Sequence, residues 1–340
     1  MMLLLIKVIF SIIFSFLFIF ICNKKSFFAH NAGETHQSFI RSKQTPLIGG
    51  IIIFIFIIIN FQNLIFTYLF LFLILLVGIL SDIRKLKSAY LRLFIQFSLV
   101  VLFIYLYEME IYTTRVYILD NFLKNNYLAI LFTAFCVLIV VNGSNFIDGT
   151  NLLAIGYFII LEFVFIVLNG RELNFDFILF QHNLIYILLI ILTLNIFNKL
   201  YLGDGGAYLL GFIYSFKCIS LYVSNPSISP FFITLILWYP AFEILFSILR
   251  KVNFNQSPIK PDSNHLHQLI YFYLEKKISN QVLRSNTVGI IINIFNFVLI
   301  YFSLMDIYNT QYQMILFIIN ISIYVFIYIR LLRFKINKNF

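Results

Sequence analysis

The chain has 340 residues, of which 61% are hydrophobic and 11% charged, and its mean hydropathy is +0.96. Soluble domains are nearer half apolar and a quarter charged, so this composition excludes a soluble globular protein. Its apolar runs approach the roughly 20 residues that cross a bilayer as a helix and are far longer than barrel strands. We therefore expect an all-α, polytopic integral membrane protein.

Apolar segments recur along the whole chain and predict about 10–11 transmembrane helices in a single domain, residues 1–340. They cover roughly 2–22, 47–60, 64–80, 91–107, 127–142, 152–168, 183–197, 206–223, 228–249, 287–304 and 312–332. The three cysteines lie in or beside these segments without disulfide or metal-ligand spacing, so we expect them to fill space.

The distribution of positive charge predicts the orientation. With the N-terminus outside, 19 of the 24 lysines and arginines fall on the inner side. Cytoplasmic loops carry an excess of these residues, so we expect an outside N-terminus and a cytoplasmic C-terminus. The connections 23–46, 81–90, 143–151, 198–205 and 250–286 then all lie at the cytoplasmic face, where we expect the chemistry.

The segment 142–151, here the asparagine segment, reads Asn-Gly-Ser-Asn-Phe-Ile-Asp-Gly-Thr-Asn between two apolar runs. Asn142, Asn145 and Asp148 recur every three residues, and the two glycines permit a tight turn or a close approach to a ligand. An ordinary polar turn is the alternative, although a simple connection between membrane helices does not need this spacing of oxygen ligands.

The residues Gly203-Asp204-Gly205-Gly206 open directly into an apolar helix. Glycines there expose backbone N–H groups at a helix N-terminus, which favours phosphate binding, and Asp204 offers a hard oxygen ligand for Mg²⁺. The alternative is an ordinary N-cap, because aspartate is a favoured residue before a helix.

Residues 81–87, Ser-Asp-Ile-Arg-Lys-Leu-Lys, place Asp82 among three cations at the membrane surface, and Arg92 and Gln96 follow on the next helix. Contact with anionic lipid explains the cations, including Lys85, but it does not explain Asp82.

The longest predicted cytoplasmic connection contains His265 and His267. We expect Asn264 or Ser263 to cap a helix that carries both histidines. Their i, i+2 spacing places the imidazoles on different helical faces, so contact with phosphate or nucleotide is favoured over a shared metal. An exposed loop that holds two histidines is the alternative.

Three charged residues lie inside apolar segments, where a charge costs about 2.5–3.5 kcal/mol at the helix centre. Glu243 lies about two turns before Arg250, a position that favours a polar cavity. Tilting, snorkelling or mutual pairing would account for Glu162 and Lys217.

Taken together, these motifs resemble those of the polyprenyl-phosphate N-acetylhexosamine-1-phosphate transferases, the MraY/WecA superfamily (glycosyltransferase family 4). The resemblance covers most of the chain, in the family's order, at Thr45 to Gly50, Ser81 to Gln96, Asn142 to Asn151, Lys199 to Gly211, Pro240 to Arg250 and Pro261 to Gln268. The pattern His265-Leu266-His267-Gln268 is similar to the His-x-His-His of the branch nearer WecA, which initiates O-antigen synthesis.

The resemblance implies transfer of a sugar 1-phosphate from a UDP-sugar to polyprenyl phosphate, with release of UMP. The sugar would be an N-acetylhexosamine or a derivative, used to initiate a surface glycan. The implied cofactor is Mg²⁺, with Mn²⁺ as a substitute. The implied location is the bacterial inner membrane, with the active site on the cytoplasmic face. The partners are the UDP-sugar, the polyprenyl phosphate and the bilayer, not nucleic acid, and a homodimer stays open.

Residue by residue, the resemblance implies a catalytic set of Asp82, Asp148, Asp204, His265 and His267. It implies substrate or nucleotide binding by Asn142, Asn151, Lys85, Lys199, Arg250, Gly203 and Gly205, and metal binding by Asp204 and Asn145.

Two positions depart from the family pattern, because Ser81 replaces the first of paired aspartates and Asn151 replaces the last aspartate of the asparagine segment. The lipid phosphate is mostly dianionic at neutral pH, with a second pKa of about 6, so a strong general base is not required. We expect an active enzyme in which Ser81→Asp is tolerated or raises activity. The alternatives are a catalytically degenerate paralogue that acts as a binding or anchor protein, and a membrane transporter, for which charges at the midplane, broken helices and repeats would be expected.

Overall fold

The structure is a computed structural model that describes residues 14–15, 17–21, 45–60, 65–171, 173, 184–257 and 262–338. The described residues form a helical bundle, in which the only β structure is an isolated parallel bridge between Leu47 and Tyr201. The predicted all-α fold is confirmed. The predicted span 2–22 and the segment 23–46 lie mostly outside the described residues.

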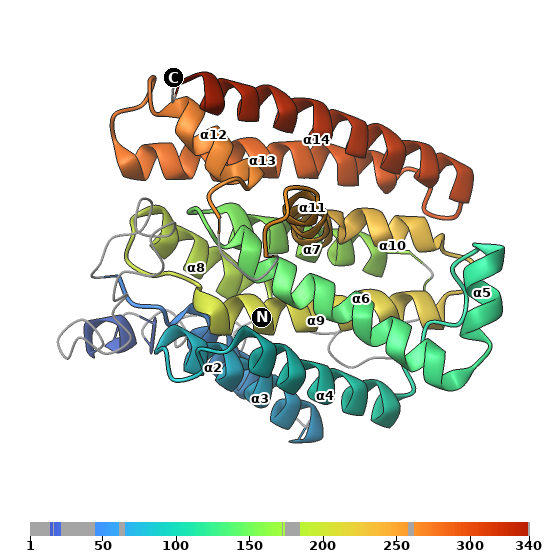
Figure 1. Ribbon diagram of the computed structural model, residues 1–340. Helices are drawn as coiled ribbons and strands as arrows, with labels where there is room; N and C mark the ends of the chain where they lie inside the picture. Colours follow the sequence, from blue (N-terminus) through green and yellow to red (C-terminus); the bar gives the residue numbers. More distant parts are fainter. Residues whose placement is uncertain are drawn as a thin grey trace.

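The helices lie in three layers (Figure 1). The first layer contains α2 (Gly49–Asn60), α3 (Ile65–Asp82) and α4 (Ala89–Tyr107). The central layer contains α6 (Asn126–Ile147), α7 (Leu153–Asn169), α8 (Ile185–Ile196), α9 (Gly203–Ser224), α10 (Pro230–Ile236) and α11 (Trp238–Asn253). The third contains α12 (Leu266–Leu274), α13 (Gln281–Ser303) and α14 (Thr310–Lys338), and α5 (Tyr117–Leu123) lies at one end. Nearly all residues of α9 are buried, so this helix is the centre of the bundle.

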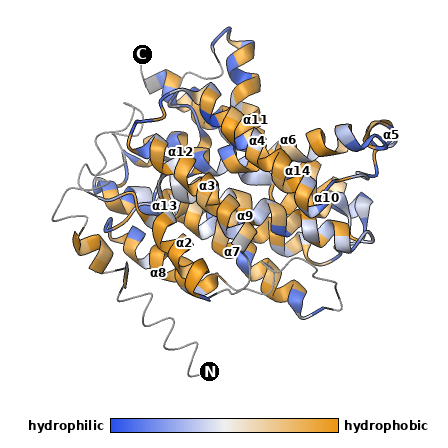
Figure 2. Ribbon diagram, turned by 90° about the horizontal axis from the view of Figure 1, so that it is seen from below, coloured by the Kyte–Doolittle hydropathy of each residue, from blue (hydrophilic) through white to orange (hydrophobic). Residues whose placement is uncertain are grey.

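Apolar residues dominate the helices, as Figure 2 shows, and make the chain a multi-pass membrane protein. Five described helices are long and apolar enough to cross a membrane: α4, α6, α9, α13 and α14. The bent pair α10 and α11 gives a sixth candidate, and α2, α7, α8 and the part Phe66–Asp82 of α3 are shorter apolar helices of 10–17 residues. The count of about 10–11 crossings requires these shorter helices to cross as well, so it stays a prediction. The orientation of the termini also stays a prediction.

The predicted span 228–249 is not one straight helix, because the chain bends by 79° between α10 and α11. Pro240 lies in the first turn of α11 and has no N–H to donate to the carbonyl of Ile236, four residues earlier. The Tyr157 hydroxyl from α7 donates to that carbonyl instead, at 2.6 Å. A side chain from a neighbouring helix thus satisfies the backbone group that the bend releases.

Two helices are longer than predicted at the ends that carry motifs. Helix α6 continues through Ile147, so the first half of the asparagine segment is helical and not a loop. Its polar side chains bond back to the preceding turn, from Asn142 to the carbonyl of Leu138 and from Ser144 to that of Val140. Helix α9 begins at Gly203, three residues before the predicted span, so Asp204 lies in its first turn.

The two charges inside α7 and α9 form a buried ion pair. The Nζ atom of Lys217 lies 2.9 Å from Oε2 of Glu162, and the two side chains are 1% and 2% exposed. The Tyr214 hydroxyl donates to the same carboxylate oxygen, and the backbone N–H of Leu184 donates to the other. Mutual pairing therefore accounts for both charges and connects α7, α9 and the start of α8.

We expect Glu162→Gln to lower the free energy of unfolding by about 3–5 kcal/mol, because it leaves the Lys217 charge buried without a counter-charge. Thermal unfolding in detergent measures the loss. The double variant Glu162→Gln, Lys217→Met should be more stable than the single variant, because it removes the orphaned charge. Equal stability of the single variant and the wild type would contradict this account.

Candidate active site

Four polar side chains from three helices form a group at the start of α9, here the aspartate group: Ser81, Asp82, Arg92 and Asp204. The Asp82 carboxylate at the end of α3 accepts the backbone N–H groups of Asp204 and Gly205, at 3.0 and 3.2 Å. Asp82 therefore caps α9, since its negative charge faces the positive end of the helix dipole. Two of the amides expected to bind phosphate thus already have an acceptor within the chain.

Ser81 connects the remaining members of this group. Its hydroxyl donates to Oδ2 of Asp204 at 2.7 Å and accepts a hydrogen bond from Nη1 of Arg92. Arg92 also lies 3.9 Å from the same Asp204 oxygen. The side chains of Arg92 and Asp204 are 26% and 18% exposed, so a ligand can reach them.

Glycines allow α2 and α3 to approach α9 closely enough to build this group. A Cβ atom on Gly50 would lie 2.4 Å from the backbone N of Gly206, and one on Gly78 would lie 2.3 Å from Cα of Gly205. The backbone N–H of Gly49 donates to the carbonyl of Tyr201 at 3.1 Å. The two glycines of the stretch Thr45 to Gly50 thus have a packing role at the start of α9.

The asparagine segment lies between the aspartate group and the histidines. Asn145 donates to the Tyr208 hydroxyl on α9 at 3.2 Å, and Asn142 donates to Gln96 on α4 at 2.9 Å. Asp148 is the C-terminal cap of α6 and is 7% exposed. At Gly149, a Cβ atom would lie 2.2 Å from Nε2 of His267, so that imidazole lies directly against the glycine.

Asn151 ends the segment and is buried, with 3% of its surface exposed. Its side-chain amide donates to the amide oxygen of Asn198, and its backbone N–H donates to the hydroxyl of Ser285 at 2.9 Å. The next residue, Leu152, has a left-handed backbone with φ of 66°. Its N–H donates to Asn195 at 2.7 Å, which offsets part of the cost of this conformation.

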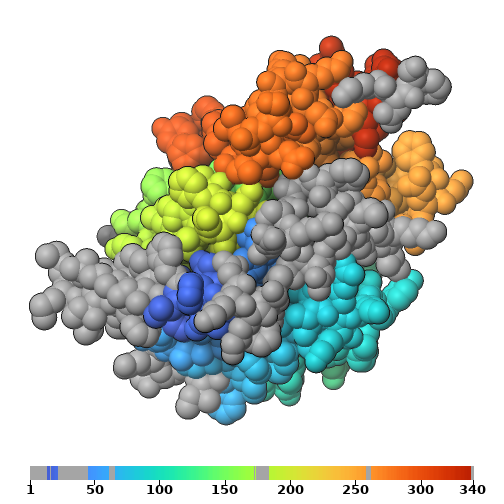
Figure 3. All heavy atoms as spheres, turned by 90° about the vertical axis from the view of Figure 1, so that its left-hand side faces the viewer, coloured from blue at the N-terminus to red at the C-terminus, as the bar shows by residue number. Residues whose placement is uncertain are grey.

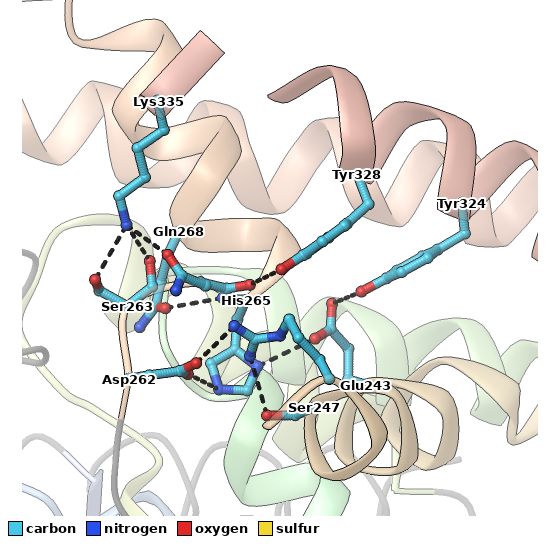
Figure 4. Close-up of polar contacts among 11 residues, drawn as sticks. Glu243, Ser247, Asp262, Ser263, His265, Gln268, Tyr324, Tyr328 and Lys335 are labelled. Carbon is cyan, nitrogen blue, oxygen red and sulfur yellow. Dashed lines mark hydrogen bonds and ion pairs between the residues drawn. The ribbon is translucent and has the colours of Figure 1, made fainter. Parts of the chain in front are cut away.

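The histidines belong to a second group, here the histidine group: Glu243, Arg250, Asp262, His265 and His267. Figure 4 labels Glu243, Asp262 and His265 of this group. Arg250 in the last turn of α11 pairs with Asp262, with 2.6 Å between Nη1 and Oδ2. Asp262 lies 3.4 Å from Nε2 of His265, and Glu243 lies 3.2 Å from Nδ1 of the same ring. These contacts connect α11 to the start of α12.

Two predictions about the histidines are wrong: the residue that caps their helix, and the placement of the two imidazoles on different helical faces. His265 itself is the N-cap of α12, not Asn264 or Ser263, because its N–H is bonded to the Gln268 side chain at 3.1 Å. Since an N-cap residue has extended backbone, the i, i+2 rule for helical faces does not apply to it. The two imidazoles stack instead, with ring centroids 5.7 Å apart and planes 10° apart.

Electrostatics keeps Asp262 ionised. Burial raises the pKa of this carboxyl, but the hydrogen bond from Arg250 and the charges of His265 and Lys251 outweigh it, so the pKa lies below its ordinary value. The contacts of the carboxylate therefore stabilise the fold above the unfolded-state pKa and are lost as the pH falls through the folded value.

The remaining predicted residues are exposed. Lys85 lies in the turn between α3 and α4, and Lys199 lies before α9. Both turns are at the end of the bundle that carries α12, and Figure 3 shows this face. The site also contains side chains that the sequence prediction left out of its residue set: Ser81, Arg92, Tyr208, Glu243 and Asp262. Of these residues, Glu243 could have been found from the sequence, because it is a charge inside an apolar segment.

The described residues fit a magnesium ion only as part of a ligand complex. No three side chains of His, Cys, Asp or Glu gather into a metal cluster within the described ranges. Asp204 is a partly exposed carboxylate whose contacts with Ser81 and Arg92 both involve Oδ2. Mg²⁺ commonly binds one or two carboxylates together with substrate phosphates and water, so Asp204 with a diphosphate matches its preference. Asn145, the second predicted metal ligand, is hydrogen-bonded to Tyr208, and Tyr208 lies one turn after Asp204 in α9.

Comparison with known proteins bears on the part of the chain that carries both the aspartate group and the asparagine segment. Residues 64–222 match the family model "Glycosyl transferase family 4". The match supports glycosyl transferase family 4. The histidine group lies outside the matched residues, and the fold brings it against them at Gly149.

Two curated relatives are similar to the chain. An undecaprenyl-phosphate alpha-N-acetylglucosaminyl 1-phosphate transferase of Thermotoga maritima is 29% identical over 131 residues, 38% of this chain and 39% of the relative. A probable undecaprenyl-phosphate N-acetylglucosaminyl 1-phosphate transferase of Bacillus subtilis is 27% identical over 220 residues, 61% of this chain and 58% of the relative. The matched regions thus span 39% and 58% of these relatives.

The geometry of Ser81 reverses the expectation for Ser81→Asp. The serine hydroxyl donates to Asp204, whereas an ionised carboxylate at the same place cannot donate and would repel Asp204. We expect this variant to unfold at lower temperature than Ser81→Ala, which removes the hydrogen bond without adding charge. Thermal unfolding at low and high salt measures the difference. A variant Ser81→Asp as stable as the wild type at low salt would show that Arg92 offsets the repulsion.

We expect Gly149→Ala to displace the His267 ring, since the added Cβ overlaps Nε2 in a buried, stacked position. The control is Gly170→Ala, where the nearest atom to a Cβ is 3.5 Å away. Binding of UDP-N-acetylglucosamine by calorimetry and thermal unfolding measure the effect. Weaker binding or lower stability should follow for Gly149→Ala alone, and identical behaviour of the two variants would contradict the contact.

Proposed function

We propose that this protein transfers a sugar 1-phosphate, an N-acetylhexosamine or a derivative, from a UDP-sugar to a polyprenyl phosphate and releases UMP. The observation that carries the proposal is the convergence of Asp82, Asp204 and the asparagine segment at one end of α9, within the residues that match glycosyl transferase family 4. Both relatives are named as undecaprenyl-phosphate N-acetylglucosaminyl 1-phosphate transferases, which supports a polyprenyl phosphate acceptor.

The reaction needs charge stabilisation more than a base. An oxygen of the lipid phosphate attacks the β-phosphorus of the UDP-sugar in line, the bond from that phosphorus to the bridging oxygen breaks, and UMP leaves. The lipid phosphate has a second pKa of about 6 and is mostly dianionic at pH 7, so no side chain must remove its proton. This agrees with Asp82, whose two oxygens both accept amides of α9.

The residues of the chain have complementary roles in this proposal. Asp204 would bind Mg²⁺ or Mn²⁺ together with the diphosphate, and the ion would supply charge neutralisation. Arg92, close to Asp204 and partly exposed, is placed to contact the phosphates, and the exposed Lys85 and Lys199 can attract an anionic donor. Asn142 and Asn151 are proposed to contact the nucleotide, Gly203 keeps the backbone at φ of 75°, and Arg250 fixes the histidine group through Asp262.

The location and pathway complete the proposal. The distribution of Lys and Arg supports an outside N-terminus and a cytoplasmic active site in a bacterial inner membrane. The pattern of His265 and His267 supports the branch nearer WecA, and hence initiation of an O-antigen, a capsule or a similar glycan.

A transporter is the alternative from another class, and two features of the structure match its signature. Helices α10 and α11 form a broken span, and Glu162 pairs with Lys217 inside the bundle. The pair is buried, and both carboxylate oxygens accept bonds from the chain, so it stabilises the helices in this conformation. The Tyr157 hydroxyl likewise bonds the carbonyl at the break. The polar groups at the start of α9 therefore favour the transferase.

Release of UMP by the purified protein tests the proposal. The assay contains undecaprenyl phosphate, Mg²⁺ and a panel of UDP-N-acetylhexosamines in detergent, and each component is omitted in turn. We expect release that requires both the lipid and the metal. Binding of UDP-sugar without turnover, by folded protein, would favour the degenerate paralogue, and absence of both would contradict the proposal.

We expect Asp204→Asn to lower the rate of UMP release on the order of 10²-fold, as loss of a group that stabilises transition-state charge does. The variant should also need more Mg²⁺ for half-maximal activity. The matched control is Asp120→Asn, which removes a carboxylate near α5, at the other end of the bundle. Unchanged activity and metal dependence of Asp204→Asn would exclude Asp204 as the ligand.

A further inference from the structure

His265 lies between two carboxylates (Figure 4). Its Nδ1 is 3.2 Å from Oε2 of Glu243, and its Nε2 is 3.4 Å from Oδ1 of Asp262. Each ring nitrogen therefore faces a carboxylate of the chain.

Both carboxylates are fixed by further contacts. The Tyr324 hydroxyl from α14 donates to the other oxygen of Glu243 at 2.8 Å. Arg250 pairs with Asp262 and also donates to the Ser247 hydroxyl at 3.2 Å. The two anions thus have fixed positions, and the ring between them has a fixed orientation.

Helix α14 also fixes the backbone that leads to His265. Lys335 contacts the carbonyl of Ser263 at 2.8 Å and the amide oxygen of Asn264 at 2.7 Å, and the Tyr328 hydroxyl donates to the carbonyl of Asn264 at 3.0 Å. Residues 263 and 264, directly before His265, are therefore held by α14.

The fixed ring of His265 in turn restricts the position of the His267 ring. The two rings stack with planes 10° apart, and the edge of Phe146 from α6 packs on His265 with centroids 5.1 Å apart. On its other side His267 lies against Gly149. The His267 ring is therefore confined between His265 and the asparagine segment.

We propose that His265 is a positioning residue: clamped between Glu243 and Asp262, it fixes the ring of His267 against the asparagine segment. This inference rests on the proposed function, and it gives His265 a positioning role in place of the predicted catalytic one. The charged and titratable groups that face His265 are Glu243 of α11, Asp262 with its partner Arg250, and His267 of α12, while Tyr324 of α14 faces Glu243.

The first test does not depend on activity. The chain has five histidines, so magic-angle-spinning NMR of protein labelled with ¹⁵N-histidine can be assigned by difference with His265→Asn and His267→Asn. The ring signals of His267 should shift in Glu243→Gln and in Asp262→Asn, because these carboxylates hold the His265 ring on which His267 stacks. His267 signals that stay unchanged in both variants would overturn the proposal. Asparagine suits the replacement because it is a good N-cap for α12.

The second test is a double-mutant cycle on UMP release with UDP-N-acetylglucosamine and undecaprenyl phosphate. His265→Asn and Glu243→Gln should each lower kcat/KM by roughly 10²-fold at most, the range of a misplaced group. The double variant should lose no more than His265→Asn alone, since the carboxylate acts only through the imidazole. Glu243→Gln keeps an acceptor for Nδ1 and should retain more activity than Glu243→Ala. Multiplied losses, or equal loss with Gln and Ala, would overturn the clamp.

A third arm covers variants of the buried Glu243 that fail to fold. Asp262→Asn changes a residue that is 14% exposed and removes the other side of the clamp. It should lower kcat/KM in the wild type but not further in His265→Asn, and an independent loss would overturn the proposal. A wild type that releases no UMP would refute the proposed function, whereas His267 signals that stay unchanged in both carboxylate variants of an active protein would refute the clamp alone.

Discussion

The contact on which the site depends is the capping of α9 by Asp82. Helix α9 is buried almost throughout, so the amides of its first turn need acceptors from within the chain, and the carboxylate at the end of α3 supplies two hydrogen bonds. This contact requires α3 to approach α9 at Gly78. Asp204 is then held near Ser81 and Arg92, and Tyr208 one turn later meets the asparagine segment.

Much of this arrangement could be predicted from the sequence, because membrane helices are recognised by the length of their apolar runs, and the polar motifs lie at the ends of those runs. The bounds of α2, α3, α4 and α7 differ from the predicted spans by one to two residues. The motifs around Asp82, Asn145 and Asp204 were expected at one face, and the hydrogen bonds join them there. Because the apolar pattern locates the ends of the helices, it also predicts which polar residues far apart in the sequence lie at the same face.

The remaining features depend on tertiary contacts that periodicity does not contain. The bend at Leu237 combines a proline in α11 with a tyrosine hydroxyl from α7, and neither alone predicts it. The stacking of His265 on His267 follows from the extended backbone of His265 at the N-cap. The sequence motif shows only that the two residues are two positions apart, which in a regular helix would place them on different faces. The α6 extension likewise depends on Gly143, where a Cβ would lie 2.1 Å from the Pro240 carbonyl oxygen of α11.

One of the two departures from the family pattern is explained by hydrogen-bond direction. Ser81 donates to Asp204, whereas an ionised aspartate at position 81 could only accept and would place a second carboxylate beside Asp204. The Asn151 side chain bonds the amide of Asn198, which can donate as well as accept, so this contact does not explain the second departure. The arrangement therefore favours a site rebuilt around one carboxylate fewer over a site that has lost its function.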